Sequence, residues 1–236
     1  AKIGLCPQEI ICWPKLTCLE QMIFARNMYG LSDSGAKDSG MKLLNRLGLL
    51  EKRNKLAQSL SGGMKRRLNL ALAMVHNPEI IILDEPEAGL DPQSRLVVRE
   101  FINEMANEKT VILTSHNMDE VDRLAKRVAI IDHGKLLLTD TPQNLKKSIG
   151  EGDILEIELP DTHHLPGTFQ KMLERASIDL KMINNIMIVR SVNVIGQIPE
   201  ITGLLKENGI AYGNIRLRGN TLEDVFIHLT GRKLRE

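Results

Sequence analysis

The feature that most restricts the fold is a series of short apolar runs that alternate with helix-forming segments. Residues 79–83 read Glu-Ile-Ile-Ile-Leu, which is typical of a strand buried on both faces of a parallel sheet. Residues 110–114 and 128–131 repeat the apolar pattern, and segments with helical spacing lie between the runs. Strands that alternate with helices predict an α/β fold with a mainly parallel sheet.

Local signals mark the ends of several elements. Thr17 with Glu20 three residues later predicts a capped helix start, and Asp91 followed by Pro92 predicts another. Residues 132–135, Asp-His-Gly-Lys, predict a hairpin turn between two short strands.

The pattern restarts near residue 150. Residues 139–150 are polar and contain Pro142 and Gly150, which predicts a short helix and a linker. Beyond the linker we expect a small second α/β domain, with strands at 154–159, 185–190 and 214–218 and helices at 168–176, at 198–208 and after Thr221. The sequence therefore predicts one domain over residues 1–147 and another over residues 148–236.

Composition matters mainly for what it excludes. The formal net charge of +1 gives no global field that attracts nucleic acid, so the basic run at residues 65–67 is interpreted as a solvated face. Cys6, Cys12 and Cys18 match neither a disulfide framework nor a CxxC metal site, which favours reduced thiols in a cytosolic protein. The histidine pair at 163–164 is interpreted as surface, and no apolar run approaches the roughly 18 residues that span a bilayer.

Two adjacent carboxylates, Asp84 and Glu85, follow the apolar run at 79–83. Acidic residues at the carboxyl end of a parallel strand lie where such folds bind ligands. One carboxylate can hold Mg²⁺, and its neighbour can orient and deprotonate an attacking water. An isolated Leu-Asp-Glu would instead favour a capped strand end with solvated acids, so the interpretation depends on the surrounding residues.

Further polar residues are expected near this pair. His116 ends the next apolar strand, and because neighbouring parallel strands end at the same edge, His116 should approach Asp84 and Glu85. An imidazole there can hold a phosphate oxygen or the attacking water. Gln8, just after the strand predicted at residues 2–7, adds a neutral donor and acceptor suited to a metal or water.

Residues 60–74 begin Leu-Ser-Gly-Gly and continue into a helix. Two glycines at a helix start leave bare backbone N–H groups, which attract anions. The stretch contains no general base and no evident metal ligand, so a phosphate bound there would be acted on by residues elsewhere.

In their order and spacing these segments resemble the nucleotide-binding domain of ABC transporters. The matching segments are Pro7-Gln8 (Q-loop), Leu60-Ser61-Gly62-Gly63 (signature motif), residues 81–86 (Walker B with the catalytic Glu), Gly89-Leu90-Asp91 (D-loop) and Ser115-His116 (H-loop). The resemblance covers residue 1 to about residue 147. It implies a partial P-loop ABC-type ATPase domain, with a helical signature subdomain at about 17–76 and a core at about 77–138.

The resemblance also implies roles for two groups of residues. In the first group, Asp84 supports Mg²⁺, Glu85 is the general base, His116 contacts the γ-phosphate, and Gln8 senses Mg²⁺ and relays to the membrane subunit. In the second, Ser61, Gly62 and Gly63 cap the γ-phosphate of an ATP held by a facing subunit, and Asp91 lies at that dimer interface.

Residues 221–231 resemble the C-terminal extension of drug-resistance exporter ATPases. The resemblance implies ATP and Mg²⁺ as cofactors, a second ATPase subunit and a separate transmembrane permease as partners, and a place on the cytoplasmic face of the cell membrane. The transported substrate is not indicated. Two alternatives stay open: a soluble ABC ATPase that acts on ribosomes or DNA, and a truncated, catalytically inactive cassette that only binds a partner.

Two features depart from the family pattern. Glu87 stands where the family usually has Thr or Ser, which we interpret as a surface change. The 236 residues contain no G-x-x-x-x-G-K-[S/T] loop, which would cradle the nucleotide phosphates. Since the chain starts almost at the Q-loop, we expect an N-terminal truncation, a chain that is inactive by itself, and uncovered apolar surface that makes it marginally stable.

Overall fold

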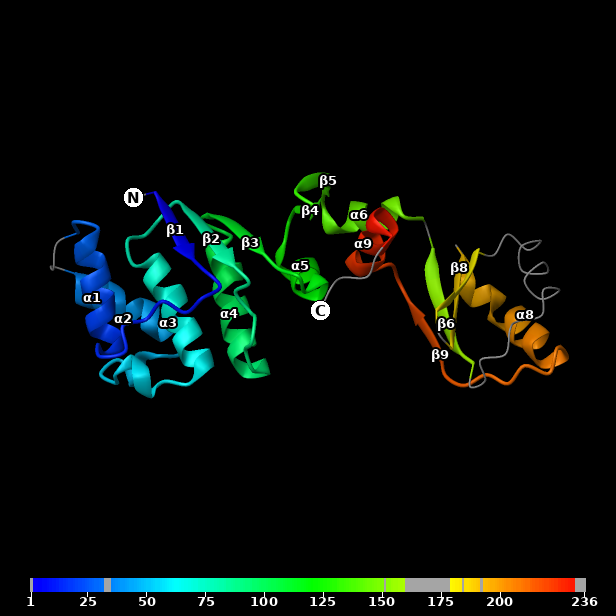
Figure 1. The fold of residues 1–236 in the computed structure, drawn as a ribbon, viewed down its shortest axis with the longest axis horizontal. Coiled ribbons are helices and arrows are strands. Elements are labelled where there is room, and N and C mark those ends of the chain that lie inside the picture. The colour runs from blue at the N-terminus through cyan, green and yellow to red at the C-terminus, as the bar shows by residue number, and fades with distance from the viewer. Residues whose placement is uncertain are drawn as a thin grey trace. The chain divides into compact units, whose positions relative to one another are not determined.

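The computed structural model describes residues 2–31, 35–150, 152–159, 179–183, 185–191 and 193–231. The chain divides into two compact units, Ala1–Leu124 and Ala125–Glu236, which are described separately (Figure 1). Residues 125–147 thus group with the C-terminal unit. The domain boundary that the sequence suggests at residues 147 and 148 stays a prediction.

A parallel sheet of three strands organises the described part of the first unit. Its strands are β1 (Ile3–Cys6), β2 (Ile80–Asp84) and β3 (Thr110–Thr114), in that order across the sheet. Both pairings are parallel. The predicted α/β class with a parallel sheet is therefore confirmed.

Helices follow and connect these strands. They are α1 (Cys18–Met28), α2 (Ala36–Arg46), the short 3₁₀ turns η1 (Leu50–Lys52) and η2 (Ala57–Ser59), α3 (Gly62–Met74), α4 (Pro92–Met105) and α5 (Met118–Leu124). The predicted capping box at the start of α1 forms between Thr17 and Glu20. Asp91 caps α4 with Pro92 in the first turn, also as predicted.

One face of the parallel sheet is buried and the other is open. Ile81 and Leu83 are fully buried in the same cluster as residues of α3 and α4, whereas Ile3, Leu5 and Ile112 are 52%, 60% and 51% exposed. Side chains alternate between the two faces along a strand, so the exposed set occupies the face opposite that cluster. Ile80 and Ile82 of β2 are only partly buried, so the prediction that residues 79–83 are buried on both faces is wrong for this structure. The expected uncovered apolar surface, in contrast, is present on this face.

The second unit begins with an antiparallel hairpin. Strand β4 (Val128–Asp132) pairs with β5 (Lys135–Asp140), and His133 and Gly134 have φ of 46° and 74°. Two consecutive positive φ values are the mark of a tight hairpin turn, so the hairpin prediction is confirmed. Among the described residues β4 pairs with β5 and not with the parallel sheet, and α6 (Pro142–Ser148) follows.

An antiparallel four-stranded sheet forms the rest of the second unit. Its strands are β6 (Asp153–Glu158), β7 (Asp179–Ile183), β8 (Ile186–Ser191) and β9 (Ile215–Arg218), in the order β7-β8-β6-β9. Helix α8 (Val194–Glu207) covers one face of this sheet, and α9 (Leu222–Thr230) packs against α6. The small second α/β fold was expected, but β7 was not. The helix predicted at 168–176 and the histidine pair at 163–164 lie outside the described residues.

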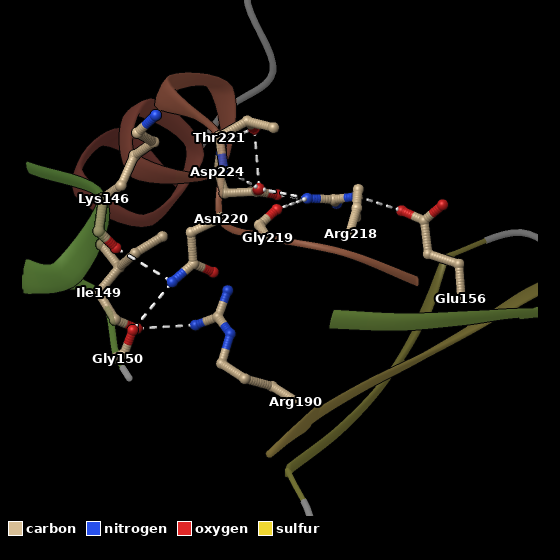
Figure 2. Close-up of polar contacts among 10 residues, drawn as sticks. All are labelled: Lys146, Ile149, Gly150, Glu156, Arg190, Arg218, Gly219, Asn220, Thr221 and Asp224. Atoms are coloured by element: carbon tan, nitrogen blue, oxygen red, sulfur yellow. Dashed lines mark hydrogen bonds and ion pairs between the residues drawn. The ribbon is translucent and has the colours of Figure 1, made fainter. Parts of the chain in front are cut away.

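Polar side chains join the end of β9 to α6 and α9 (Figure 2). Arg218 donates to Glu156 Oε1 at 2.7 Å and to Asp224 Oδ2 at 2.6 Å. Asn220 and Arg190 donate to backbone carbonyls at the end of α6. We call these residues of β9, α9 and their neighbours the β9–α9 junction, which fixes the sheet to the helix pair.

Within the described ranges, no helix combines the length and the apolar character needed to cross a bilayer.

Candidate functional site

The two adjacent carboxylates lie at the carboxyl end of β2, as the sequence predicts. Asp84 is the last residue of β2 and stands opposite Thr114 of β3. The Thr114 hydroxyl donates to Asp84 Oδ1 at 2.5 Å, and the Glu85 amide donates to the Thr114 carbonyl at 3.1 Å. Glu85 has a φ of 49°, a left-handed conformation uncommon for residues other than glycine. Such strained backbone clusters at functional sites.

His116 reaches the second carboxylate. Its backbone N–H donates to Glu85 Oε1 at 2.9 Å, and its ring Nδ1 lies 2.7 Å from the same oxygen. The Glu85 side chain is 16% exposed and that of His116 is 68% exposed. The Glu85 carboxylate is thus largely buried, while most of the His116 imidazole is open to solvent or to a bound ligand.

Gln8 is held near this edge of the sheet by its backbone. Its carbonyl accepts a hydrogen bond from Arg66 at 2.7 Å, and the same guanidinium bonds the carbonyls of Asp84 and Glu85. The Gln8 residue is exposed. Arg66 itself is 4% exposed, so the interpretation of residues 65–67 as a solvated face is wrong for its central member.

The predicted anion-binding segment starts α3. The Ser61 hydroxyl accepts from the Met64 amide at 3.2 Å and caps the helix. Ser61 and Gly62 are exposed. A Cβ on Gly63 would lie 2.8 Å from Ser94 Oγ and 3.2 Å from Asp91 Oδ2, so only glycine allows the start of α3 to approach the start of α4 this closely.

Asp91 is fixed by the helix that it caps. Its Oδ1 accepts from the Ser94 amide at 2.9 Å, and hydrogen bonds from Ser94 lower the pKa of the Asp91 carboxyl. The structure therefore brings the predicted residues into two groups. Asp84, Glu85 and His116 meet at the end of β2, and Gly63, directly after Ser61 and Gly62, lies against Asp91 between α3 and α4.

The donors of the first group fit Mg²⁺ held mainly by a nucleotide and water. The described residues contain no cluster of three or more His, Cys, Asp or Glu side chains that could hold a metal by themselves. Mg²⁺ usually takes one or two carboxylates and completes its shell with waters and substrate phosphates. A carboxylate at a strand end, such as Asp84, is the kind of ligand that Mg²⁺ takes, so the residues present fit the ion that the sequence predicts.

Glu87 is not a surface residue, which corrects the interpretation of this position. It is 4% exposed and accepts two hydrogen bonds from Arg99, at 3.0 Å and 2.6 Å. Arg95 Nε lies 3.7 Å from the same carboxylate. Glu87 therefore pairs the segment after β2 with α4.

One residue that supports the His116 segment was not predicted from the sequence. Glu120 of α5 is 2% exposed and accepts from the Ser115 hydroxyl at 2.5 Å, next to the His116 backbone. Burial raises the pKa of the Glu120 carboxyl. A glutamate at helical spacing in α5 resembles any solvated helix residue, and no local signal distinguishes it.

The cysteines are free thiols, as predicted. Burial raises the pKa of Cys6 to about 11 and also that of Cys12 to about 11. Both stay protonated at neutral pH, which makes them poor nucleophiles.

Comparisons with known proteins agree with the motif order. A family profile described as "ABC transporter" matches residues 1–88. The chain is 34% identical over 240 residues to the linearmycin resistance ATP-binding protein LnrL of Bacillus subtilis (strain 168), an alignment that covers 100% of this chain and 76% of that protein. It is 33% identical over 237 residues to the Nod factor export ATP-binding protein I of Paraburkholderia xenovorans (strain LB400), covering 100% and 75%.

Larger proteins share only a part with this chain. The human retinal-specific phospholipid-transporting ATPase ABCA4 is 41% identical over 150 residues, which is 64% of this chain but 7% of that protein. A solved structure titled "Structure of ATP binding subunit of ABC transporter" superposes with a TM-score of 0.56 at 24% identity, covering 63% of this chain and 62% of the other. At that identity the superposition supports the fold alone.

The chain belongs to the family of ABC transporter ATP-binding proteins, as the two bacterial relatives that match along the whole of this chain establish. The resemblance drawn from the five motifs is confirmed, and with it the partial P-loop ABC-type ATPase fold.

Proposed function

We propose that this chain belongs to the ATP-binding subunit of an ABC exporter, which couples ATP binding and hydrolysis in a dimer to export through a separate permease. The names of the bacterial relatives, one a resistance protein and one an export protein, support the exporter assignment. The subunit would lie at the cytoplasmic face of the membrane through its permease. The substrate, which the permease selects, stays open.

The observation that carries the proposal is the contact between Glu85 and His116 beside Asp84. Glu85 would act as general base on the attacking water, because a sheltered carboxylate held at one oxygen by His116 has its other oxygen available for a proton. Asp84 would hold Mg²⁺, which neutralises charge on the phosphates. His116 would contact the γ-phosphate, and Gln8 would sense the metal and relay to the permease.

The second group would act across the dimer. The N–H groups at residues 61–63 point from a helix start, where the backbone favours anions, and would cap the γ-phosphate of an ATP held by the facing subunit. Asp91 would lie at the same interface. The proposal applies to a subunit in which these residues work together with a lysine-containing phosphate loop.

The alternative is a catalytically inactive cassette that only binds a partner. Tight ATP binding by the 236 residues alone would exclude that alternative.

Glu85→Gln, made in the subunit assembled with its permease, tests the base. Turnover should fall by about 100-fold or more, while ATP binding, measured by equilibrium binding of a fluorescent nucleotide, should be retained. Glu104→Gln is the matched control, because Glu104 undergoes the same chemical change at an exposed position beside Arg46. Unchanged turnover in Glu85→Gln would refute the assignment of the base.

A further inference from the structure

The buried side chain of Arg66 on α3 donates hydrogen bonds to five backbone carbonyls. A guanidinium carries five N–H donors in a planar fork, and here each meets a backbone carbonyl. Nε bonds Pro86 at 3.4 Å, Nη1 bonds Pro7 and Gln8 at 2.6 Å and 2.7 Å, and Nη2 bonds Asp84 and Glu85 at 2.6 Å and 2.7 Å.

These carbonyls belong to the segments that leave two neighbouring strands. Residues 7–8 follow β1 and residues 84–86 follow β2, and the two strands pair in parallel. One turn further along α3, the Asn69 amide donates to the Glu9 carbonyl at 3.3 Å and its oxygen accepts from the Ile11 amide at 3.2 Å. Helix α3 thus holds the Gln8 segment from two positions on one face, but only Arg66 also reaches the end of β2.

The Arg66 bonds fix the direction of the Glu85 side chain. The Asp84 carbonyl belongs to the peptide before the Glu85 Cα, and the Glu85 carbonyl belongs to the peptide after it. Because Nη2 bonds both carbonyls, it holds both peptide planes that flank that Cα. Their orientation sets the φ of 49° and therefore the direction of the Cα–Cβ bond.

We propose that Arg66 is a positioning residue for ATP hydrolysis. By holding the peptides on both sides of Glu85, Arg66 sets the direction of the Glu85 carboxylate. By also bonding the Pro7 and Gln8 carbonyls, it keeps the position of Glu85 constant relative to the Gln8 segment. The proposal rests on the proposed role of Glu85 as the general base.

Arg66→Lys is the first test, again in the subunit assembled with its permease. Lysine keeps the charge but has one compact donor group, which cannot hold the Pro7–Gln8 and Asp84–Pro86 carbonyls together. We expect kcat per bound nucleotide to fall about 10- to 100-fold, since a misplacement of about 1 Å costs rate on that scale. The KM for ATP should change much less than kcat, because Arg66 bonds only backbone carbonyls and none of the side chains proposed to touch the nucleotide.

Arg67→Lys is the matched control. Arg67 is the neighbouring residue on α3, carries the same charge and bonds a single carbonyl, that of Leu47, at 2.8 Å. An ammonium can keep one such bond, so kcat should stay within about a factor of two of wild type. If Arg66→Lys does not fold, Arg66→Gln replaces it, because its planar amide keeps two donors.

The double variant Arg66→Lys with Glu85→Gln separates the two proposals. If Arg66 acts through Glu85, the double variant is no slower than Glu85→Gln alone. Slow turnover in Glu85→Gln together with wild-type kcat in Arg66→Lys would overturn the role of Arg66 and leave the base intact. A lower melting temperature and a smaller nucleotide-binding fraction with unchanged kcat per bound nucleotide would show a merely structural arginine and would also overturn it.

Discussion

Replacing Glu87 by alanine removes the buried carboxylate that joins the segment after β2 to α4. The Glu87 side chain is 4% exposed and that of Arg99 is 21% exposed, and their closest N–O distance is 2.6 Å. The variant leaves the Arg99 guanidinium without these two acceptors in a largely buried position. The chain must then rehydrate the charge or leave it unpaired.

The size of the loss follows from this burial. Breaking a fully buried ion pair from one side costs about 3–5 kcal/mol. Because Arg99 can reach some water, we expect Glu87→Ala to lower the free energy of unfolding by about 2–3 kcal/mol. Arg99→Ala should cost a similar amount, because the Glu87 carboxylate, at 4% exposure, then keeps only the longer 3.7 Å contact with Arg95. The double variant should cost less than the sum of the two by about 2 kcal/mol.

The single tryptophan of the sequence makes the assay specific. Trp13 lies in the first unit, as Glu87 does, and its ring meets the Phe24 ring edge-on at 5.2 Å. Its fluorescence during urea unfolding therefore follows that unit. Glu104→Ala is the control, because the Arg46–Glu104 pair is exposed and should be worth about 0–1 kcal/mol. A Glu87→Ala cost no larger than the Glu104→Ala cost would refute the reasoning.

Three further predictions follow from the burial and packing of single residues. Burial raises the pKa of Glu120, so the folded chain binds its proton more tightly than the unfolded chain and stability falls as pH rises above the ordinary Glu range. Glu120→Gln should flatten that part of the profile, measured by urea unfolding at about pH 5 and about pH 8, and an unchanged slope would contradict it. Gly63→Ala should lower the melting temperature through its contact with α4, whereas Gly62→Ala, with no atom within 4 Å of its added Cβ, should not; equal melting temperatures would disprove the close approach. Arg218→Met should cost about 2–4 kcal/mol by removing its bonds to Asp224 and β6, seen as faster amide hydrogen exchange in β9 and α9; unaltered exchange would argue against the junction.

The sequence predicts what depends on neighbouring residues along the chain. The capping box predicted from Thr17 and Glu20 forms as their spacing requires. The approach of His116 to Glu85 also follows from strand order alone, because parallel neighbours end at one edge. Assignment of catalytic roles to these residues stays a prediction.

Burial of charge, in contrast, depends on which elements meet in space. Arg66 stands in a basic run and Glu87 stands in a polar turn, and in each case the local pattern is that of a solvated residue. Arg66 is buried because α3 lies across the ends of two strands. Glu87 is buried because α4 supplies Arg99. Burial of residues 79–83 on both faces was misjudged for the same reason, since an apolar run does not reveal how many of its faces are covered.

The pairing of α6 with α9 gives the second unit the topology of an insertion. Leu145 of α6 and Val225 of α9 are both buried, and the four-stranded sheet lies in the sequence between these two helices. A deletion that starts at residue 148 would therefore remove the packing partner of α6 as well as the sheet. An excision of the sheet that keeps both helices and joins them by a short linker would preserve their contact. The helix pair α6–α9 and the four-stranded sheet could then be studied separately.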